Sequence, residues 1–279
     1  MWLAAGYFDE STDEFEDRCF TVAGFIGPHF AGLSLDMKWK DRLEEWNLDY
    51  FKASEIEGGF GQFAQYRDDP NALTKPLSAR EKDLIKAIKT SFVDLICDED
   101  EMTGIGAVLL LRDYQVFKLQ EPKLAAKLPN PYTLCGQFVM MEAGFEMLAC
   151  NERYPTRLQG LMRPVFDSHE DYSFKFQHGF DSFCKKNPTC SQFLLPPIYE
   201  DDQTYHCLQA ADCLAYEARR LVDNALFDPK RPERVAMARL RQTVSKIYFI
   251  KYDGLKLIAE KQRPDFISLT PALENKRRF

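Results

Sequence analysis

The first 26 residues contain the feature that most constrains the fold of this chain. Two apolar runs, at 2–8 and 19–26, flank a densely acidic turn in the sequence WLAAGYFDESTDEFEDRCFTVAGFI. The second run is rich in Val, Thr, Phe and Ile, and a Gly-Pro pair follows it, which is typical of a strand that ends there. The pattern predicts two antiparallel strands. Asp9 at the end of the first run then has two interpretations: it caps a solvated turn, or it presents a carboxylate to a metal ion.

Helical and strand-like patterns alternate after this hairpin. Apolar spacing predicts helices at 33–46, 78–97, 132–150, 174–184 and 206–221, and short apolar runs predict strands at 104–111, 158–166 and 191–195. Ser78 and Glu81 form a capping-box pattern at one helix start. One or two further helices and an irregular tail are expected after Pro229. This order predicts a mixed α/β sheet with helices packed on it, in one domain.

The composition excludes several classes of protein. With 45% hydrophobic residues, 22 Phe and 12 Tyr, the chain is able to bury a large core, so a disordered protein is not expected. No apolar run approaches the ~20 residues that a membrane span requires. The first residues lack the basic region of a secretory signal, so we expect a cytoplasmic protein with reduced cysteines. A zinc site built from Cys184, Cys190, His178 and His206 is disfavoured because the spacing matches no common pattern.

Charge is unevenly distributed along the chain. Residues 217–279 hold 15 Lys and Arg against 8 Asp and Glu, a net charge of +7, whereas residues 1–216 carry a net charge of −14. A basic end that contacts phosphates beside an acidic body that binds cations would produce this asymmetry. Solvated helix faces would also produce it.

Three aspartates occupy unusual places. Asp9 follows the apolar run WLAAGYF, Asp167 follows LMRPVF, and Asp212 lies inside the apolar helical run YHCLQAADCLAYEA. Turn or helix capping would explain Asp9 and Asp167. Asp212 is harder to explain, because a buried mid-helix Asp without a partner costs several kcal/mol (roughly).

Helical spacing places Gln209, Asp212 and Tyr216 on one stripe beside the apolar face of their helix. Carboxylates that converge from separate elements are stabilised together by Mg²⁺ or Mn²⁺, which prefer oxygen ligands. Pairs of such ions, about 4 Å apart, cleave phosphodiesters. The three aspartates therefore suggest a metal-dependent phosphoryl-transfer site.

Four segments carry a resemblance to a known family: YFDEST, the following strand FTVAGFI, VFDSHED at a later strand end, and LQAADCLAYEARR. Over roughly residues 3–220 the chain resembles the bacterial and phage family called domain of unknown function 3800, which is similar to ribonuclease H in fold. The resemblance implies an α/β domain at 1–225 with an RNase H-like mixed sheet flanked by helices. Residues 226–279 are then expected to form a basic, helical C-terminal extension packed on the same domain.

The resemblance also implies roles for individual residues. It places Asp9, Asp167 and Asp212 at an acidic centre with Glu10 beside them, and Thr12 stands where the family usually has Gly. The segment YFKASEI suggests Lys52 and Glu55. In the ribonuclease H pattern a helical Glu completes the metal ligands, for which Glu142 is the candidate and Glu146 lies one turn on; a salt bridge at the edge of the core is an equal alternative for either.

The resulting hypothesis is a Mg²⁺- or Mn²⁺-dependent nuclease or related phosphoryl-transfer enzyme acting on DNA or RNA. Asp9, Asp167, Asp212 and Glu142 would bind metal, Gln209 and Lys52 would orient substrate or a neighbouring carboxylate, and Arg219 and Arg220 would contact phosphates. The main alternative is a non-catalytic RNase H-like module that binds nucleic acid or protein. An aspartyl-nucleophile phosphatase is less favoured, because that chemistry needs an acid two positions after the nucleophile and Ser11 stands there. The oligomeric state is left open.

Overall fold

A single sheet organises the structure, a computed structural model that describes residues 3–13, 18–71, 73–153, 160–168, 170–231 and 233–260, with the side chains of 170–175 left out. Its six strands run in the order β5-β4-β1-β2-β3-β6. The strands are β1 (Leu3–Thr12), β2 (Cys19–Pro28), β3 (Thr103–Leu110), β4 (Leu161–Asp167), β5 (Ile198–Glu200) and β6 (Val244–Ile250).

The sheet is mixed. β2 pairs antiparallel with β1 and with β3, whereas β4 is parallel to β1, β5 to β4 and β6 to β3. Both faces of the central strands are covered, so β2 and β3 are buried along almost their whole length. Such continuous burial explains why their sequences are apolar runs rather than alternating patterns.

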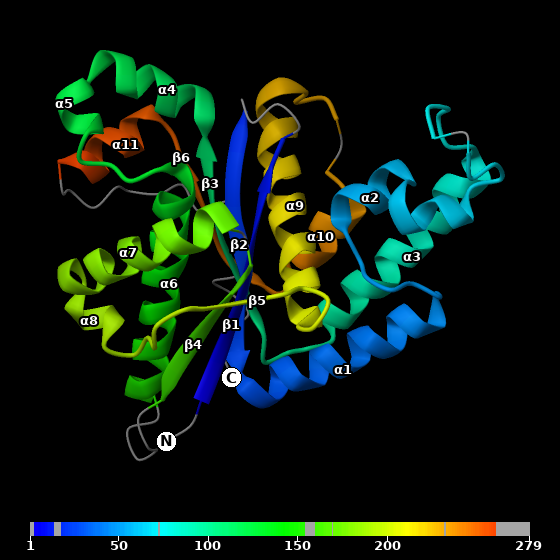
Figure 1. Cartoon of the computed structure of the whole chain (residues 1–279), viewed down its shortest axis with the longest axis horizontal. Coiled ribbons are helices and arrows are strands. Elements are labelled where there is room, and N and C mark those ends of the chain that lie inside the picture. The colour runs from blue at the N-terminus through cyan, green and yellow to red at the C-terminus, as the bar shows by residue number, and fades with distance from the viewer. Residues whose placement is uncertain are drawn as a thin grey trace.

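Helices cover the sheet in two layers (Figure 1). On one side α9 crosses β1 and β2, and the helices outside it share its core cluster. This layer comprises α1 (His29–Glu45), α2 (Ala53–Gly58), the 3-10 helix η1 (Gly61–Tyr66), α3 (Ala79–Cys97), α9 (His206–Phe227) and α10 (Val235–Leu240). The other layer comprises α4 (Leu111–Gln120), α5 (Pro122–Ala125), α6 (Pro131–Arg153), α7 (Glu170–Lys186), α8 (Pro188–Ser191) and α11 (Tyr252–Ala259).

The expected mixed α/β sheet flanked by helices is confirmed, as are the N-terminal hairpin and the capping box. Ser78 Oγ accepts a hydrogen bond from Glu81 N, and Glu81 Oε2 accepts one from Ser78 N. Parts of four expectations lie outside the described residues: position 2 of the first run, positions 14–17 of the acidic turn, positions 158–159 of the fourth strand, and the tail after residue 260.

Three elements differ from the expectation. β1 continues past Asp9 to Thr12, so Asp9 lies inside a strand rather than after it. The strand expected at 191–195 is reduced to one bridge at Leu194, and the true edge strand is β5. The segment 226–279, expected to be helical, also contributes β6 to the main sheet, because its Val244–Ile250 run pairs with β3 and covers that edge.

The remaining features concern the cysteines and the membrane. All eight cysteines lie in the described part of the chain, and none of them forms a disulfide bond there. Of the helices that the structure describes, none is both long enough and apolar enough to cross a lipid bilayer.

Candidate functional site

Asp9 and Asp167 lie side by side where the parallel pairing of β1 with β4 ends, Asp9 inside β1 and Asp167 at the last residue of β4. The register of β1 and β4 pairs Tyr7 with Val165 and Phe8 with Phe166, which makes Asp9 and Asp167 the next pair along. Side chains alternate between the faces of a sheet, and Tyr7 and Val165 both belong to the core cluster under α9. Both carboxylates therefore face the α9 layer, although 158 positions of sequence separate them.

Asp212 reaches the same place from above the sheet. It lies in the first half of α9, which packs across β1 and β2, and its side chain is 5% exposed. Its Oδ2 accepts a 2.7 Å hydrogen bond from the backbone N–H of Ala53, the first residue of α2. The helical stripe expected from the sequence thus points into the interior and towards α2.

Each of the three aspartates has one oxygen fixed by a backbone N–H. Glu10 N donates to Asp9 Oδ1 at 2.7 Å and Ser168 N donates to Asp167 Oδ1 at 2.9 Å, in addition to the bond from Ala53 to Asp212. Asp9 is only 2% exposed, and its Oδ2 is buried without a hydrogen-bond partner in the described part of the chain. A buried carboxylate oxygen in this state is strongly destabilising unless a cation lies near it.

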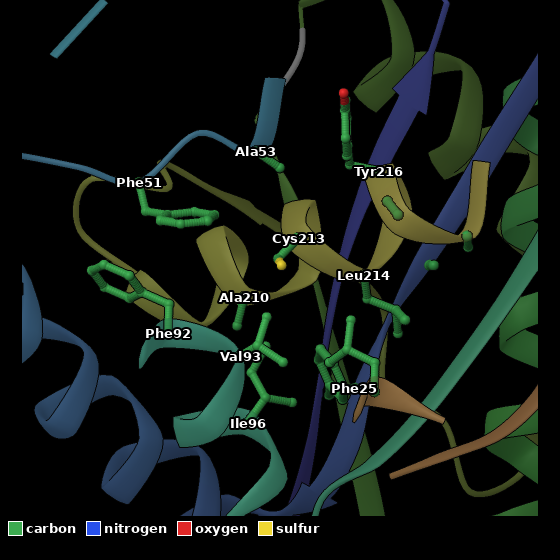
Figure 2. Close-up of a cluster of buried hydrophobic side chains, with 14 of the residues drawn as sticks. Phe25, Phe51, Ala53, Phe92, Val93, Ile96, Ala210, Cys213, Leu214 and Tyr216 are labelled. Atoms are coloured by element: carbon green, nitrogen blue, oxygen red, sulfur yellow. The ribbon is translucent and has the colours of Figure 1, made fainter. Parts of the chain in front are cut away.

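The nearest cation is Lys52. Its Nζ lies 4.0 Å from Asp9 Oδ2 and 3.9 Å from Asp202 Oδ2, and its side chain is 35% exposed. The preceding residue, Phe51, is fully buried and packs on Trp39, Phe92 and Phe63, with ring centroids 5.5, 4.8 and 6.1 Å away. Figure 2 shows Phe51 beside Phe92 over α9, with Ala53 next to them. These packed aromatic rings hold Lys52 and the start of α2 against four aspartates. We call these four, Asp9, Asp167, Asp202 and Asp212, the acidic group.

Burial and mutual repulsion govern ionisation in this group. Burial, with repulsion from Glu10, Asp212 and Asp167, raises the pKa of Asp9 well above its usual value, against the opposing effect of Lys52. Burial also raises the pKa of Asp212 and that of Asp167. For Lys52, burial acts to lower the pKa, but the surrounding aspartates outweigh it and the pKa is raised. One ammonium group thus faces several carboxylates.

Glu10 flanks the same group from the other face of β1. It follows Asp9 in the strand, so its side chain points to the face where Phe8 packs. Burial first and Asp167 second raise the pKa of Glu10 to about 7, and its Oε2 is buried without a hydrogen bond to any described residue.

Two acidic residues near the site were missed from the sequence. Glu200 pairs with Asp167 across β5 and β4, and Asp202 follows in the loop that leads to α9. Burial raises the pKa of Asp202 to about 6. The signal was the acidic run Glu200-Asp201-Asp202 at a strand end, and it was overlooked because that strand was expected at 191–195.

Gln209 supports the site from within the core. Its side chain is fully buried; Oε1 accepts hydrogen bonds from Trp39 Nε1 at 3.0 Å and from Phe51 N at 2.8 Å, and Nε2 donates to the carbonyl of Asp202 at 2.9 Å. The residue therefore joins α1, the Lys52 segment and the Asp202 loop. It orients the elements of the site and is shielded from any substrate.

Glu142 does not join the aspartates. It lies on α6, on the opposite face of the sheet, where Lys246 Nζ donates to both carboxylate oxygens at 3.2 Å and the Tyr248 hydroxyl donates to Oε2. These partners belong to β6, which is four strand positions from β4, about 19 Å at the usual spacing of strands. Glu142 thus lies in a salt bridge, the alternative weighed for it from the sequence, and the structure does not bring it together with the three aspartates.

Arg219 and Arg220 also have local partners. Arg219 is 7% exposed, and its Nε donates to Ser11 Oγ at 3.1 Å. Arg220 pairs with Asp223 at 3.3 Å on the same helix. Neither guanidinium group is presented as an open phosphate contact.

The donor atoms of the acidic group suit Mg²⁺ or Mn²⁺, because they are carboxylate oxygens and one of them, Asp9 Oδ2, accepts no hydrogen bond from any described residue. Their arrangement is not yet a finished metal site: within the described ranges, no three or more His, Cys, Asp or Glu side chains are arranged to hold one ion. The ammonium group of Lys52 lies within 4.0 Å of both the Asp9 and the Asp202 carboxylates.

Neither a scan of protein-family models nor a search of curated proteins found a match to this chain. The resemblance to the domain of unknown function 3800 family therefore rests on the sequence motifs alone.

Proposed function

We propose that the protein is a divalent-metal-dependent phosphodiester hydrolase that acts on nucleic acid through Asp9, Asp167 and Asp212, on an RNase H-like sheet. The observation that carries this proposal is the buried Oδ2 of Asp9, which accepts no hydrogen bond from any described residue and is surrounded by further carboxylates where the parallel pairing of β1 with β4 ends. Ligand sites of α/β sheets lie at the carboxyl ends of the strands.

The residues have distinct tasks in this proposal. Asp9, Asp167 and Asp212 offer their free carboxylate oxygens to Mg²⁺ or Mn²⁺, while backbone N–H groups hold the other oxygens in orientation. The bound ions would supply a water of lowered pKa and would neutralise charge on the phosphate. Glu10 and Asp202, with pKa values of about 7 and 6, are suited to exchange protons near neutral pH.

One observation favours the non-catalytic alternative. Lys52 already supplies a positive charge to Asp9 and Asp202, so an RNase H-like module without metal could remain folded with this ion pair alone. The phosphatase alternative gains no such support, because Ser11 accepts a hydrogen bond from Arg219 and Asp9 is almost completely buried.

Calorimetric titration with Mn²⁺ separates the enzyme from the module. We expect the wild-type protein to bind Mn²⁺ and to cleave at least one of three substrates (single-stranded DNA, duplex DNA and RNA) in its presence. Asp212→Asn should bind Mn²⁺ at least tenfold more weakly and lose cleavage, because a charged ligand is removed while the hydrogen bond to Ala53 N is retained.

Glu44→Gln is the matched control, because Glu44 is an exposed carboxylate on α1. It should behave as the wild type in both assays. Absence of Mn²⁺ binding and of cleavage in the wild type, or equal values for Asp212→Asn, would reject the hydrolase and leave the binding module.

A further inference from the structure

We infer that Lys52 is a built-in counter-cation which leaves Asp9 and Asp202 when a divalent ion binds, so that its ammonium group is released to pair with an anionic group of the substrate. This inference deepens the proposed function and rests on it for the identity of the substrate. It begins from the position of one lysine among the carboxylates of the site.

The contacts of Lys52 are those of a cation that is held by charge alone. Its Nζ is 4.0 Å from Asp9 Oδ2 and 3.9 Å from Asp202 Oδ2, at the outer limit of an ion pair, and it forms no hydrogen bond with any described residue. The carboxylates of Asp9, Asp167 and Asp212, in contrast, are each fixed by a backbone N–H group at 2.7 to 2.9 Å. The carboxylates are therefore the fixed part of the site, and the lysine is the exchangeable part.

The charge of Lys52 alone does not balance the surrounding carboxylates, so a cation of higher charge is favoured at this place. Asp9, Asp167, Asp202 and Asp212 all act on Lys52, so one positive charge faces four acidic groups. The unpartnered Asp9 Oδ2 is buried and directed to this place. A divalent ion coordinated by that oxygen would repel an ammonium group about 4 Å away, since like charges at this distance in a protein interact strongly.

Lys52 also has a route out. Its side chain is 35% exposed, whereas Asp9 is 2% exposed. The backbone on either side remains anchored, because Phe51 is buried and Ala53 N is bound to Asp212. The side chain alone can therefore swing towards solvent, while its Cα stays beside the acidic group. A released ammonium at the rim of a metal site is positioned to contact a phosphate.

The decisive comparison is Mn²⁺ affinity in the absence of substrate. If Lys52 competes with the ion, Lys52→Met should bind Mn²⁺ at least tenfold more tightly than the wild type, because the competing charge is gone and the side-chain volume is kept. Lys52→Arg, which keeps the charge, should stay within threefold of the wild type. Lys40→Met, at an exposed lysine of α1, is the control and should leave the affinity unchanged.

A second measurement follows the lysine itself. Acetylation by an amine-reactive ester, quantified by mass spectrometry, should increase several-fold at Lys52 when Mn²⁺ is added, because the amine leaves its carboxylate partners and moves into solvent, where the reagent reaches it. Lys40 serves as the internal reference. Far-ultraviolet circular dichroism of each variant checks that the fold is retained.

The outcomes distinguish this inference from the proposed function. Equal Mn²⁺ affinity in the wild type and Lys52→Met, with unchanged Lys52 acetylation, overturns the exchange even if the protein cleaves nucleic acid. Tighter binding by Lys52→Met without cleavage of any substrate by the wild type supports the exchange and rejects the hydrolase. Failure of Lys52→Met to bind Mn²⁺ at all overturns both.

Discussion

At the scale of single residues, the site depends on buried polar groups that are satisfied by bonds to other elements. Gln209 is the clearest case, because its fully buried amide makes three hydrogen bonds: with Trp39, Phe51 and the carbonyl of Asp202. Removing such a group leaves its partners buried and unbonded, which costs more than the bonds themselves contribute. A fully buried residue thus helps to determine where Lys52 and Asp202 lie.

We therefore predict that Gln209→Met lowers the free energy of unfolding by about 3 kcal/mol, since the replacement matches the side chain in size but leaves three buried groups without partners. Urea denaturation followed by circular dichroism measures the change. Gln192→Met, at an exposed glutamine, is the control and should stay within about 0.5 kcal/mol of the wild type. A similar small change for Gln209→Met would show that water replaces the lost bonds.

At the scale of elements, a buried charge network fixes α2 to α9, α3 and the start of α10. Glu217 on α9 is 0% exposed and is contacted by Lys89 from α3 and by Arg234, whose Nε lies 2.9 Å from Oε2. Arg234 also donates to Glu57 on α2, with Nη1 2.7 Å from Oε1. Because the first turn of α2 supplies Ala53 N–H to Asp212, this network holds one wall of the acidic site in place.

Breaking this network should be costly. Arg234→Met removes one of two cations from a fully buried carboxylate, and we expect it to lower the free energy of unfolding by about 3 kcal/mol. The exposed pair Arg80–Asp68, whose side chains are 85% and 57% exposed, provides the matched control. Arg80→Met should cost less than about 0.5 kcal/mol in the same urea titration. Equal effects of the two substitutions would mean that Lys89 alone neutralises Glu217.

At the scale of the whole molecule, the buried acidic side chains of the site lower the stability of the metal-free protein when they are ionised. Burial raises the pKa of Glu10 from 4.5 to about 7 and that of Asp202 from 3.8 to about 6. The folded protein therefore holds protons that the unfolded chain has released in this range of pH. The stabilisation that these two groups contribute is fully present below the pKa values they have in the unfolded chain. It is lost as the pH rises through the pKa values they have in the folded protein.

The expected result is that, in the presence of a chelator, the free energy of unfolding falls by about 4 kcal/mol between pH 5 and pH 8. Glu10→Gln should reduce this slope by about two thirds, because it removes the group with the larger shift between pH 5 and 8. Thermal or urea unfolding at several pH values gives the profile. A flat or rising profile would contradict the burial of ionisable carboxylates at this site.

Glu57 affects stability only at lower pH. Burial would raise its pKa, but Arg234 and Lys89 lower the pKa to about 2. The stabilisation that ionised Glu57 contributes is therefore lost as the pH falls below 4.5.

Patterns in the sequence were sufficient to predict those features that lie within a single helix or strand. The capping box at Ser78 and the helical stripe of Gln209 and Asp212 follow from spacing along a single helix. The pairing of strands that are far apart in the sequence could not be predicted from such patterns. The expected helical C-terminal segment contains β6, because a short β-branched and aromatic run acquires its strand partner only when β3 is beside it.

The same dependence on long-range contacts explains two differences between the predicted and the observed site, at Glu142 and at Asp202. The spacing of Glu142 places it on a helix, but does not say which face of the sheet that helix covers; α6 covers the face opposite to α9, and Lys246 neutralises the residue there. Asp202 was missed because its neighbourhood depends on β5, a strand of only three residues that is defined by its pairing with β4.

By itself, the sequence determined that the chain forms apolar strands and amphipathic helices in an α/β order, and that Asp9, Asp167 and Asp212 stand at positions where a carboxylate is costly. Tertiary structure alone decided that the three lie near one another: the parallel alignment of β1 with β4 sets Asp9 beside Asp167, and α9, which packs across β1 and β2, places Asp212 close enough to raise the pKa of both. It also decided that Lys52 is the cation among them. The physical reason is that residue type and local period report burial and secondary structure, whereas charges far apart in the chain interact only after the sheet has aligned them.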